Sequence, residues 1–323
     1  MSRARVGLWV GAAAVVGLTA VWIGAQSRPE DGIARYDRES RYYRIRVVDY
    51  PARDRRCLYF SRSRGIQSSM ILSAPERLDL EYSQAMVAAL ALQGAPQDVL
   101  LIGLGGASIP KFLQKEFPDL RLDIVELDPD VVRVCQEYFE FRGSPGVRVI
   151  VMDGRMYLKR AEKTYDVILL DAYAADHVPF HLTTLEFVEL AKERLRAGGV
   201  VASNLWERSF NRFYLAELKT YQTAFPQVYL VPAGRSGNTI VFGAMSETPT
   251  TRKEWVLRAE EMVRGKDFGF ELPELIGKEY EYLTTRRIRE AALTDDSAPV
   301  DTLRREHPRF FEDTAEGRKG DGE

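Results

Sequence analysis

Seven residues in the middle of the chain have the types that a nucleoside-binding pocket uses. They are glycines and carboxylates, and they occur in the order Gly103, Gly105, Gly106, Glu126, Asp153, Gly154 and Asp171. Glycine lets a backbone turn tightly and lets a ligand approach the backbone amides. Glu126 stands 23 residues after Gly103, where a carboxylate can accept hydrogen bonds from both ribose hydroxyls. Asp153 can accept from an adenine amino group in the same way.

These residues follow predicted β-strands. From residue 98 onward strand and helix patterns alternate, which is typical of a mostly parallel sheet covered on both faces. The predicted strands are 99–102, 122–125, 147–151, 167–170 and 200–205. The predicted helices are 109–117, 129–139, 185–195 and 213–225, the third of them ended by Gly198 and Gly199. Ligands of such sheets bind beyond the carboxyl ends of the strands, so we expect the seven residues to converge there.

The last part of this region predicts a hairpin. Strand patterns at 228–231 and 239–242 flank a Gly-rich turn, which indicates an antiparallel edge on the sheet. Asp128 directly precedes Pro129 and is interpreted as the N-cap of helix 129–139. Together the elements predict an α/β fold, a Rossmann-like and mostly parallel seven-stranded sheet.

A smaller unit is expected upstream of this sheet. Strand patterns at 42–48, 57–60 and 66–72 are separated by turn-rich pieces, which predicts a small antiparallel sheet, and 78–92 has helical spacing. The predicted boundaries are a small β domain at 39–78, a Rossmann-like cofactor-binding catalytic domain at 79–245, a helical extension at 246–311 and a disordered tail at 312–323.

The amino-terminal residues 1–27 have the character of a membrane anchor. No charged side chain occurs from Val6 to Ala25, a length sufficient to cross a bilayer, and Trp9 and Trp22 lie near its two ends. A cleavable signal peptide is the alternative, although its apolar region is usually shorter. Residues 28–38 are interpreted as a linker. Arginines flank the stretch on both sides, so its orientation stays open, and a cytoplasmic catalytic domain is expected on chemical grounds.

Composition excludes several other classes. The formal net charge of −2 provides no general attraction for nucleic acid. Cys57 and Cys135 are the two cysteines, and their spacing fits neither a metal nor a redox motif; Cys135 falls in the apolar register of a predicted helix and is expected in the core. We see no cluster with metal-ligand spacing. A nicotinamide dehydrogenase would also use the glycine run and Glu126, but it would not require Asp153 and Gly154 in their place.

The combined motifs resemble the nucleoside-binding core of spermidine synthases. The segments that carry the resemblance are 103–108, 125–128, 153–154 and 165–176, with 39–43 and 65–68 resembling the small N-terminal sheet of that family. The resemblance covers about residues 38 to 245. It implies a class I methyltransferase-type core, a polyamine substrate and, because such relatives commonly dimerise, a possible homodimer.

The resemblance also implies roles for individual residues. Decarboxylated S-adenosylmethionine is the implied cofactor, with Gln67, Glu126, Asp153 and Gly154 around it. Asp171 is implied to assist the attacking amine, and Tyr82 and Asp176 to contact the polyamine. This role suits a carboxylate, because a cationic amine must lose a proton before it attacks, and a general base contributes about 100-fold or more.

Three departures from the family pattern affect this interpretation. Gly106 stands where the family usually has an aspartate that binds the propylamine nitrogen of the cofactor. Tyr82-Ser83-Gln84 replaces a usual Tyr-His-Glu, and the gate segment 171–176 is one residue longer than usual. The first departure permits intact S-adenosylmethionine as the cofactor instead.

Other polar residues keep two interpretations. His177 and His181 are interpreted as ordinary loop histidines, with a base or substrate contact as the alternative. Asp295 and Asp296 either reach the pocket as extra amine ligands or form a solvated turn.

Three functions therefore stay open. The first hypothesis is an aminopropyltransferase, favoured by Asp171 and Asp176. The second is an S-adenosylmethionine-dependent methyltransferase, favoured by Gly106. The third is a noncatalytic, membrane-held module that binds a nucleoside or a polyamine.

Overall fold

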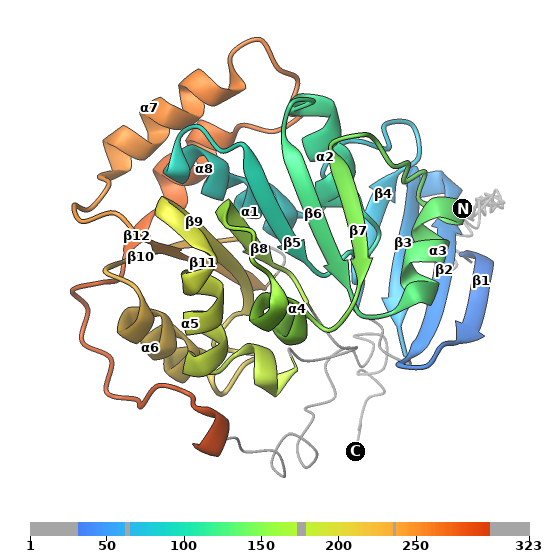
Figure 1. The fold of residues 1–323 in the computed structure, drawn as a ribbon. Helices are drawn as coiled ribbons and strands as arrows, with labels where there is room; N and C mark the ends of the chain where they lie inside the picture. Colours follow the sequence, from blue (N-terminus) through green and yellow to red (C-terminus); the bar gives the residue numbers. More distant parts are fainter. Residues whose placement is uncertain (1–31, 62–64, 173–178, 235–236, 298–323) are drawn as a thin grey trace, which may run out of the picture. The chain divides into compact units, whose positions relative to one another are not determined.

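A computed structural model of the 323-residue chain describes residues 32–61, 65–172, 179–234 and 237–297. The main sheet in these residues has eight strands in the order β12-β10-β11-β9-β8-β5-β6-β7 (Figure 1). Its strands are β5 (Asp98–Ile102), β6 (Arg121–Glu126), β7 (Val147–Val151), β8 (Tyr165–Leu170), β9 (Leu195–Trp206), β10 (Gln227–Pro232), β11 (Asn238–Ala244) and β12 (Glu281–Tyr282). The five strands from β9 to β7 pair in parallel, and the hairpin β10–β11 pairs antiparallel, as predicted.

Two predictions about this sheet were wrong. The sheet has eight strands where seven were predicted, because the two-residue β12 pairs with Tyr229 and Leu230, and such a short strand has no readable period. The glycine pair also does not end a helix. Helix α5 (Leu185–Glu193) ends earlier, and β9 begins at Leu195 with Gly198 at a φ of +72° inside it. The parallel register with β8 shifts at this point.

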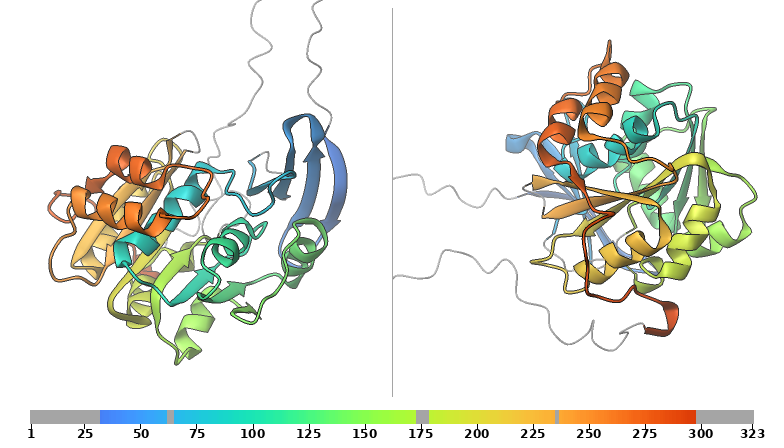
Figure 2. Two further views of the ribbon diagram at one scale, coloured as in Figure 1. Left: turned by 90° about the horizontal axis from the view of Figure 1, so that it is seen from above. Right: turned by 90° about the vertical axis from the view of Figure 1, so that its left-hand side faces the viewer.

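Helices cover both faces of the sheet (Figure 2). Each face has its own hydrophobic core. The first core includes α1 (Glu81–Gln93), α2 (Ser108–Glu116), α3 (Pro129–Tyr138), α7 (Arg252–Val263) and α8 (Leu272–Glu279). The second includes α4 (Gly154–Arg160), α5 and α6 (Tyr214–Ala224). Side chains of a strand alternate between the two, so Leu101 packs in the first core and Ile102 in the second.

Helix α1 is buried on all sides, which explains its lack of an amphipathic pattern. Its residues from Ala85 to Leu92 are at most 4% exposed. It packs between the sheet and the carboxyl-terminal helices, and the Trp255 indole of α7 donates a hydrogen bond to the carbonyl of Ala88 at 3.0 Å. The predicted helical extension therefore closes the first core. The Asp295–Ser297 turn that follows is a short 3-10 helix.

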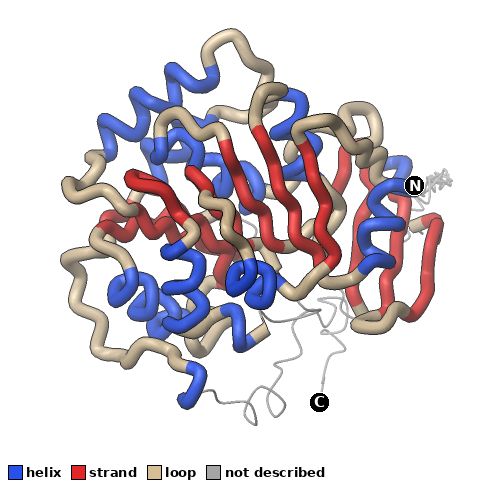
Figure 3. Tube along the Cα trace, in the orientation of Figure 1, coloured by secondary structure: helices blue, strands red, loops and turns tan. Residues whose placement is uncertain are grey.

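The small sheet has four antiparallel strands, β1 (Ile33–Glu39), β2 (Arg44–Tyr50), β3 (Arg55–Phe60) and β4 (Ser68–Ile71), in that order. It lies beside α3 (Figure 3). Residues 33–38, predicted as part of a linker, belong to β1, which is exposed along nearly its whole length and shows no alternation of apolar and polar residues. Strand β1 is held in place by its antiparallel backbone pairing with β2 and by the ion pair of Arg35 with buried Asp49, at 2.6 Å.

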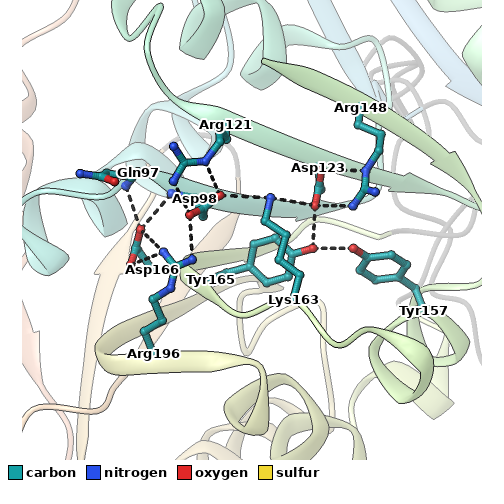
Figure 4. Close-up of polar contacts among 10 residues, drawn as sticks. All are labelled: Gln97, Asp98, Arg121, Asp123, Arg148, Tyr157, Lys163, Tyr165, Asp166 and Arg196. Carbon is teal, nitrogen blue, oxygen red and sulfur yellow. Dashed lines mark hydrogen bonds and ion pairs between the residues drawn. The ribbon is translucent and has the colours of Figure 1, made fainter. Parts of the chain in front are cut away.

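Buried carboxylates at the amino ends of the parallel strands are held by cations (Figure 4). Asp98, 2% exposed, binds Arg121 through both oxygens at 2.7 and 2.8 Å and Arg196 at 2.8 Å. Asp123 binds Arg148 through both oxygens. Lys163 lies between the two aspartates, 3.1 Å from Asp98 and 3.2 Å from Asp123.

The predicted membrane anchor, residues 1–27, lies outside the described residues. None of the helices described here combines the length and the apolar character that a bilayer span requires.

Candidate active site

The glycine run joins the ends of two strands. Gly103 follows β5 directly and has a φ of +97°, a conformation that favours glycine. A Cβ at this position would lie 2.3 Å from the carbonyl oxygen of Asp171. The backbone at the end of β5 can therefore approach the end of β8 this closely only without a side chain at 103.

Glu126 ends β6 and is 5% exposed. Its carboxylate accepts backbone N–H groups from Leu104 and Asp128, each at 2.9 Å. Burial raises the pKa of Glu126, and the two backbone hydrogen bonds oppose the rise. Each oxygen keeps a further lone pair for a ligand hydroxyl. The glycine loop and the end of β6 are thereby held together by the residue predicted to bind ribose.

Asp128 is the N-cap of α3, as predicted, and accepts from the N–H of Asp130 at 2.9 Å. Its second oxygen accepts a hydrogen bond from the Ser40 hydroxyl. This contact ties the small sheet to the helix that follows Glu126. Cys135 on the same helix is buried, as predicted, and its thiol donates to the carbonyl of Gly105 at 2.7 Å.

Asp153 and Gly154 lie where β7 meets α4. Asp153 caps α4 by accepting the N–H of Met156 at 2.9 Å, and its other oxygen lies 3.1 Å from Nε2 of His181. A Cβ at Gly154 would lie 2.5 Å from Cγ2 of Ile102, so the helix start packs directly on β5. The His181 contact is with this aspartate and not with Asp171. The adenine-binding role of Asp153 stays a prediction.

Asp171 follows β8 and is the most perturbed acid at this edge of the sheet. Its carboxylate accepts from Nδ2 of Asn204 at 3.0 Å and is hydrogen-bonded to Tyr82. Both donors are neutral. Burial raises the pKa of Asp171 to about 7, and the two hydrogen bonds oppose the rise. A carboxyl with this pKa can take up and release a proton near neutral pH.

Tyr82 brings the small sheet to the same place. It lies in the first turn of α1, and its hydroxyl oxygen lies 3.4 Å from the backbone carbonyl oxygen of Gln67. Burial raises the pKa of Tyr82 well above its ordinary value, so the hydroxyl stays protonated. Gln67, Tyr82 and Asp171 are thus brought together from three separate elements, whereas Asp176 and His177 lie outside the described residues.

The space beside Gly106 is filled by another side chain. A Cβ at Gly106 would lie 2.7 Å from Oγ of Ser68 and 3.1 Å from the ring of Phe139. The Ser68 hydroxyl also lies 3.2 Å from the Ser108 hydroxyl. The cofactor loop is therefore lined here by a neutral hydroxyl pair, and a carboxylate at 106 requires Ser68 to move.

Asp295 is solvent-exposed, with 42% of its side chain accessible, and it is ion-paired on the surface. It forms a two-pronged ion pair with Arg155 of α4 and accepts from the Thr184 hydroxyl at 2.8 Å. Arg155 also donates to the carbonyl of His181 at 3.1 Å. Through Arg155 and Thr184, the carboxyl-terminal segment holds in place the residues that follow segment 171–176. Among the described residues, no group of three or more potential ligands is arranged to hold a metal ion.

Sequence reasoning assigned no role to Asn204, Ser68 or Arg155. Asn204 stands in an apolar strand pattern, and a polar residue inside such a pattern was the one available signal. A small pocket lies at this end of β8 and β9. Its lining residues are Ile102, Leu170, Ala172, Leu182, Phe187, Ser203 and Asn204.

Comparisons with known proteins agree with this arrangement. The spermine/spermidine synthase domain matches residues 81–253. The polyamine aminopropyltransferase of Vibrio vulnificus is 31% identical over 281 residues, which is 83% of this chain and 91% of that protein.

Solved structures share the fold. The structure of spermidine synthase from Thermotoga maritima aligns with a TM-score of 0.62 and 18% identity over 77% of this chain and 84% of that one. Human methyltransferase-like protein 13, solved in complex with SAH, aligns with a TM-score of 0.53 and 28% identity over 58% of this chain and 92% of that one. The fold is Rossmann-like and of the methyltransferase type, with a small antiparallel N-terminal sheet. The chain belongs to the spermine/spermidine synthase family.

Proposed function

We propose that this protein transfers an aminopropyl group from decarboxylated S-adenosylmethionine to a polyamine such as putrescine. The observation that carries the proposal is Asp171, a carboxyl with a pKa of about 7 and two neutral hydrogen-bond donors at the carboxyl edge of the sheet. The similarity to the Vibrio vulnificus polyamine aminopropyltransferase, over 83% of this chain and 91% of that protein, supports it.

The chemistry needs little besides positioning and one proton acceptor. The amine nitrogen of the acceptor attacks the aminopropyl carbon bound to the sulfonium, a carbon–nitrogen bond forms, and the carbon–sulfur bond breaks with its electron pair going to sulfur. Before the attack, the acceptor ammonium loses a proton to Asp171, which frees the lone pair of its nitrogen. A neutral hydroxyl at Tyr82 and a neutral amide at Asn204 favour this step, because a cation beside Asp171 would compete with the amine for the carboxylate.

The cofactor is proposed to lie across the strand ends. Glu126 accepts from the ribose, Asp153 and Gly154 face the adenine, and Gly103, Gly105 and Gly106 let the backbone approach. Gln67 closes the site from the small sheet, and Asp176 is proposed to hold the far end of the polyamine. The SAH complex of human methyltransferase-like protein 13 supports a ligand of this adenosyl class.

Product analysis tests the proposal directly. The full chain is incubated with decarboxylated S-adenosylmethionine and putrescine, and spermidine and methylthioadenosine are measured by mass spectrometry. Equimolar appearance of both products is expected. Cofactor binding without any product is the result of the noncatalytic alternative and overturns the proposal.

Methyl transfer is the second candidate, and the geometry at Gly106 favours it. The cofactor loop carries no carboxylate for a propylamine nitrogen, and Ser68 occupies the space that such a side chain needs. Calorimetry with intact and decarboxylated S-adenosylmethionine separates the two functions, since each predicts tighter binding of its own cofactor.

An engineered loop sharpens this comparison. The double variant Ser68→Gly/Gly106→Asp opens the space and supplies the carboxylate, and Ser68→Gly alone is its matched control. The double variant is expected to bind the decarboxylated cofactor about tenfold more tightly than the control does, as a charge-assisted hydrogen bond to the amine predicts.

The setting of the enzyme in the cell is a separate proposal. We propose that residues 1–27 anchor the chain in a membrane with the catalytic domain on the cytoplasmic side, where both substrates occur, and that the protein forms a homodimer. Carbonate extraction and protease protection of membranes test the anchor and its orientation. Light scattering of the detergent-solubilised chain tests the dimer.

A further inference from the structure

Two buried amides connect Asp171 to the antiparallel part of the sheet. Nδ2 of Asn238 donates to Oδ1 of Asn204 at 2.8 Å, and Nδ2 of Asn204 donates to Oδ1 of Asp171 at 3.0 Å. Asn238 is 8% exposed and Asn204 is 3% exposed. The chain of donors therefore runs through the protein interior and ends on the proposed general base.

Strand register places the three residues in line. Asn204 on β9 pairs with Ile240 of β11, so Asn238 is its diagonal neighbour on the same face. On the other side, Ser203 pairs with Leu170 of β8, and Asp171 is the next residue beyond that pair. Strands β11 and β9 thus contribute one member each, and the residue directly after β8 is the third.

The direction of the hydrogen bonds matters because an amide has two different ends. An ionised carboxylate only accepts, so it is stabilised when Asn204 presents its NH₂ and destabilised when it presents its carbonyl oxygen. The carbonyl oxygen of Asn204 then needs a donor of its own inside the protein. Asn238 is that donor, so it selects the orientation in which Asn204 supports ionised Asp171.

We propose that Asn238 is a positioning residue for the transfer reaction: by holding the Asn204 amide in one orientation, it keeps Asp171 available as a proton acceptor. This inference rests on the proposed function. Asn238 itself touches neither the carboxyl of Asp171 nor any reacting atom. Its effect reaches the reaction through the proton affinity and the orientation of that carboxyl.

The surroundings of Asp171 make the effect measurable. Among the described residues, Tyr82 of α1 is the one titratable side chain whose interaction shifts the Asp171 pKa, and Asn204 of β9 is the other polar contributor. Burial raises the pKa of Asp171, both hydrogen bonds oppose the rise, and the resulting pKa is about 7. Loss of the Asn204 donor therefore leaves burial less opposed, and the pKa rises further.

Asn238→Ala tests the proposal through the pH profile of kcat/KM. The acid limb is expected to move to higher pH by about half to one unit, because one neutral hydrogen bond to the charged form is weakened. Activity is then about three- to tenfold lower at pH 6.5 and within about twofold of the parent at pH 9, where Asp171 is ionised in both proteins. A residue that only stabilises the fold would lower both values equally.

Asn211→Ala is the matched control. Asn211 also donates to a buried carboxylate, Glu217, at 2.8 Å, and burial raises the pKa of Glu217 to about 7 as well. This variant removes the same kind of hydrogen bond from a group outside the proposed site. Its acid limb is expected to coincide with that of the parent.

A second readout is independent of turnover. Infrared spectra across the pH range report the carbonyl band of a protonated carboxyl, and the component absent from Asp171→Asn belongs to Asp171. That component is expected to persist to higher pH in Asn238→Ala. If Asn238→Ala does not fold, Asn238→Ser is the substitute. Its side chain is too short to donate to Asn204 but fills more of the space, and it is expected to move both readouts in the same direction.

The two readouts separate the relay from the proposed function. An unmoved carboxyl band in Asn238→Ala overturns the relay, whether or not the protein turns over. A moved band in a protein that makes no spermidine supports the relay and rejects aminopropyl transfer. A shifted acid limb together with a shifted band supports both.

Discussion

The two edges of the parallel strands treat buried aspartates in opposite ways. At the amino edge, Asp98 is surrounded by Arg121, Lys163 and Arg196, and these hold its pKa well below the usual range (Figure 4). At the carboxyl edge, the partners of Asp171 among the described residues are the neutral donors Asn204 and Tyr82, and burial raises its pKa to about 7. The same residue type is thus fixed as an anion at one end of the sheet and left able to exchange a proton at the other.

The difference indicates that the amino edge of the sheet contributes to stability and the carboxyl edge to proton exchange. Cations at the amino edge neutralise charges that would otherwise be buried without partners, which stabilises the strand starts. At the carboxyl edge, the carboxyl of Asp171 is buried beside neutral partners, and this burial raises its proton affinity. A substrate amine can then serve as the missing cation. The following predictions test that division.

Asp171→Asn is expected to have the largest effect. The amide keeps the shape and the neighbours of Asp171 but cannot take up a proton, so kcat is expected to fall by at least about 100-fold. Cofactor affinity measured by calorimetry should stay nearly unchanged. Unaltered turnover in this variant would remove Asp171 from the mechanism.

Asp98→Asn is expected to lower stability and to leave turnover unchanged. It removes the charge that Arg121, Lys163 and Arg196 share, and hydrogen bonds to charged groups contribute about 1.5–3 kcal/mol, so a loss of about 2 kcal/mol in the free energy of unfolding is expected. Turnover below the unfolding temperature should match the parent. Chemical denaturation and steady-state kinetics on one preparation measure both, and a large loss of turnover in the folded variant would erase the contrast between the edges.

The pH dependence of stability is expected to have opposite signs at the two edges. The folded-state pKa of Asp171 lies above its ordinary value of 3.8, so its stabilising contribution is complete below about pH 4 and is lost as the pH rises through about 7. The folded-state pKa of Asp98 lies below its ordinary value. The stabilising contribution of Asp98 is therefore lost as the pH falls below that ordinary value. Between pH 5 and 8 the parent should therefore lose on the order of 2 kcal/mol more than Asp171→Asn does.

Urea denaturation at several pH values measures this difference. Glu217, which also has a raised pKa, is present in both proteins and cancels from the comparison. Parallel stability curves for the parent and Asp171→Asn between pH 5 and 8 would contradict the raised proton affinity of Asp171.

Lys163→Met is expected to have the smallest effect. Lys163 bridges Asp98 and Asp123, but its side chain is 33% exposed and both aspartates keep an arginine. A loss of about 0.5–1 kcal/mol in the free energy of unfolding is expected, as for a partly exposed ion pair. The loss should shrink in high salt, and a salt-independent loss would point to packing of the lysine stem instead.

Much of the carboxyl edge was predictable because parallel strands place their ends at one edge. The period of the strands and the positions of Gly103, Glu126, Asp153 and Asp171 were sufficient to predict that these residues lie at neighbouring strand ends. The N-cap role of Asp128 and the burial of Cys135 followed from local patterns alone. The amino edge carried no such signal, since Asp98 and Lys163 are ordinary charged residues in sequence and meet only through the sheet order.

Local sequence therefore determined most of the strands and helices and the carboxylates at their ends, because backbone preferences and side-chain periodicity act over a few residues. Strands β1 and β12, which show no alternation of apolar and polar residues, were the exceptions. The tertiary structure alone decided which buried carboxylate is paired with cations and which has neutral partners. Asn238 and Asn204 reach Asp171 only through the pairing of three strands, and Ser68 comes beside Gly106 from another sheet. A pKa depends on burial and on neighbours from distant segments, and these exist only once the chain has folded.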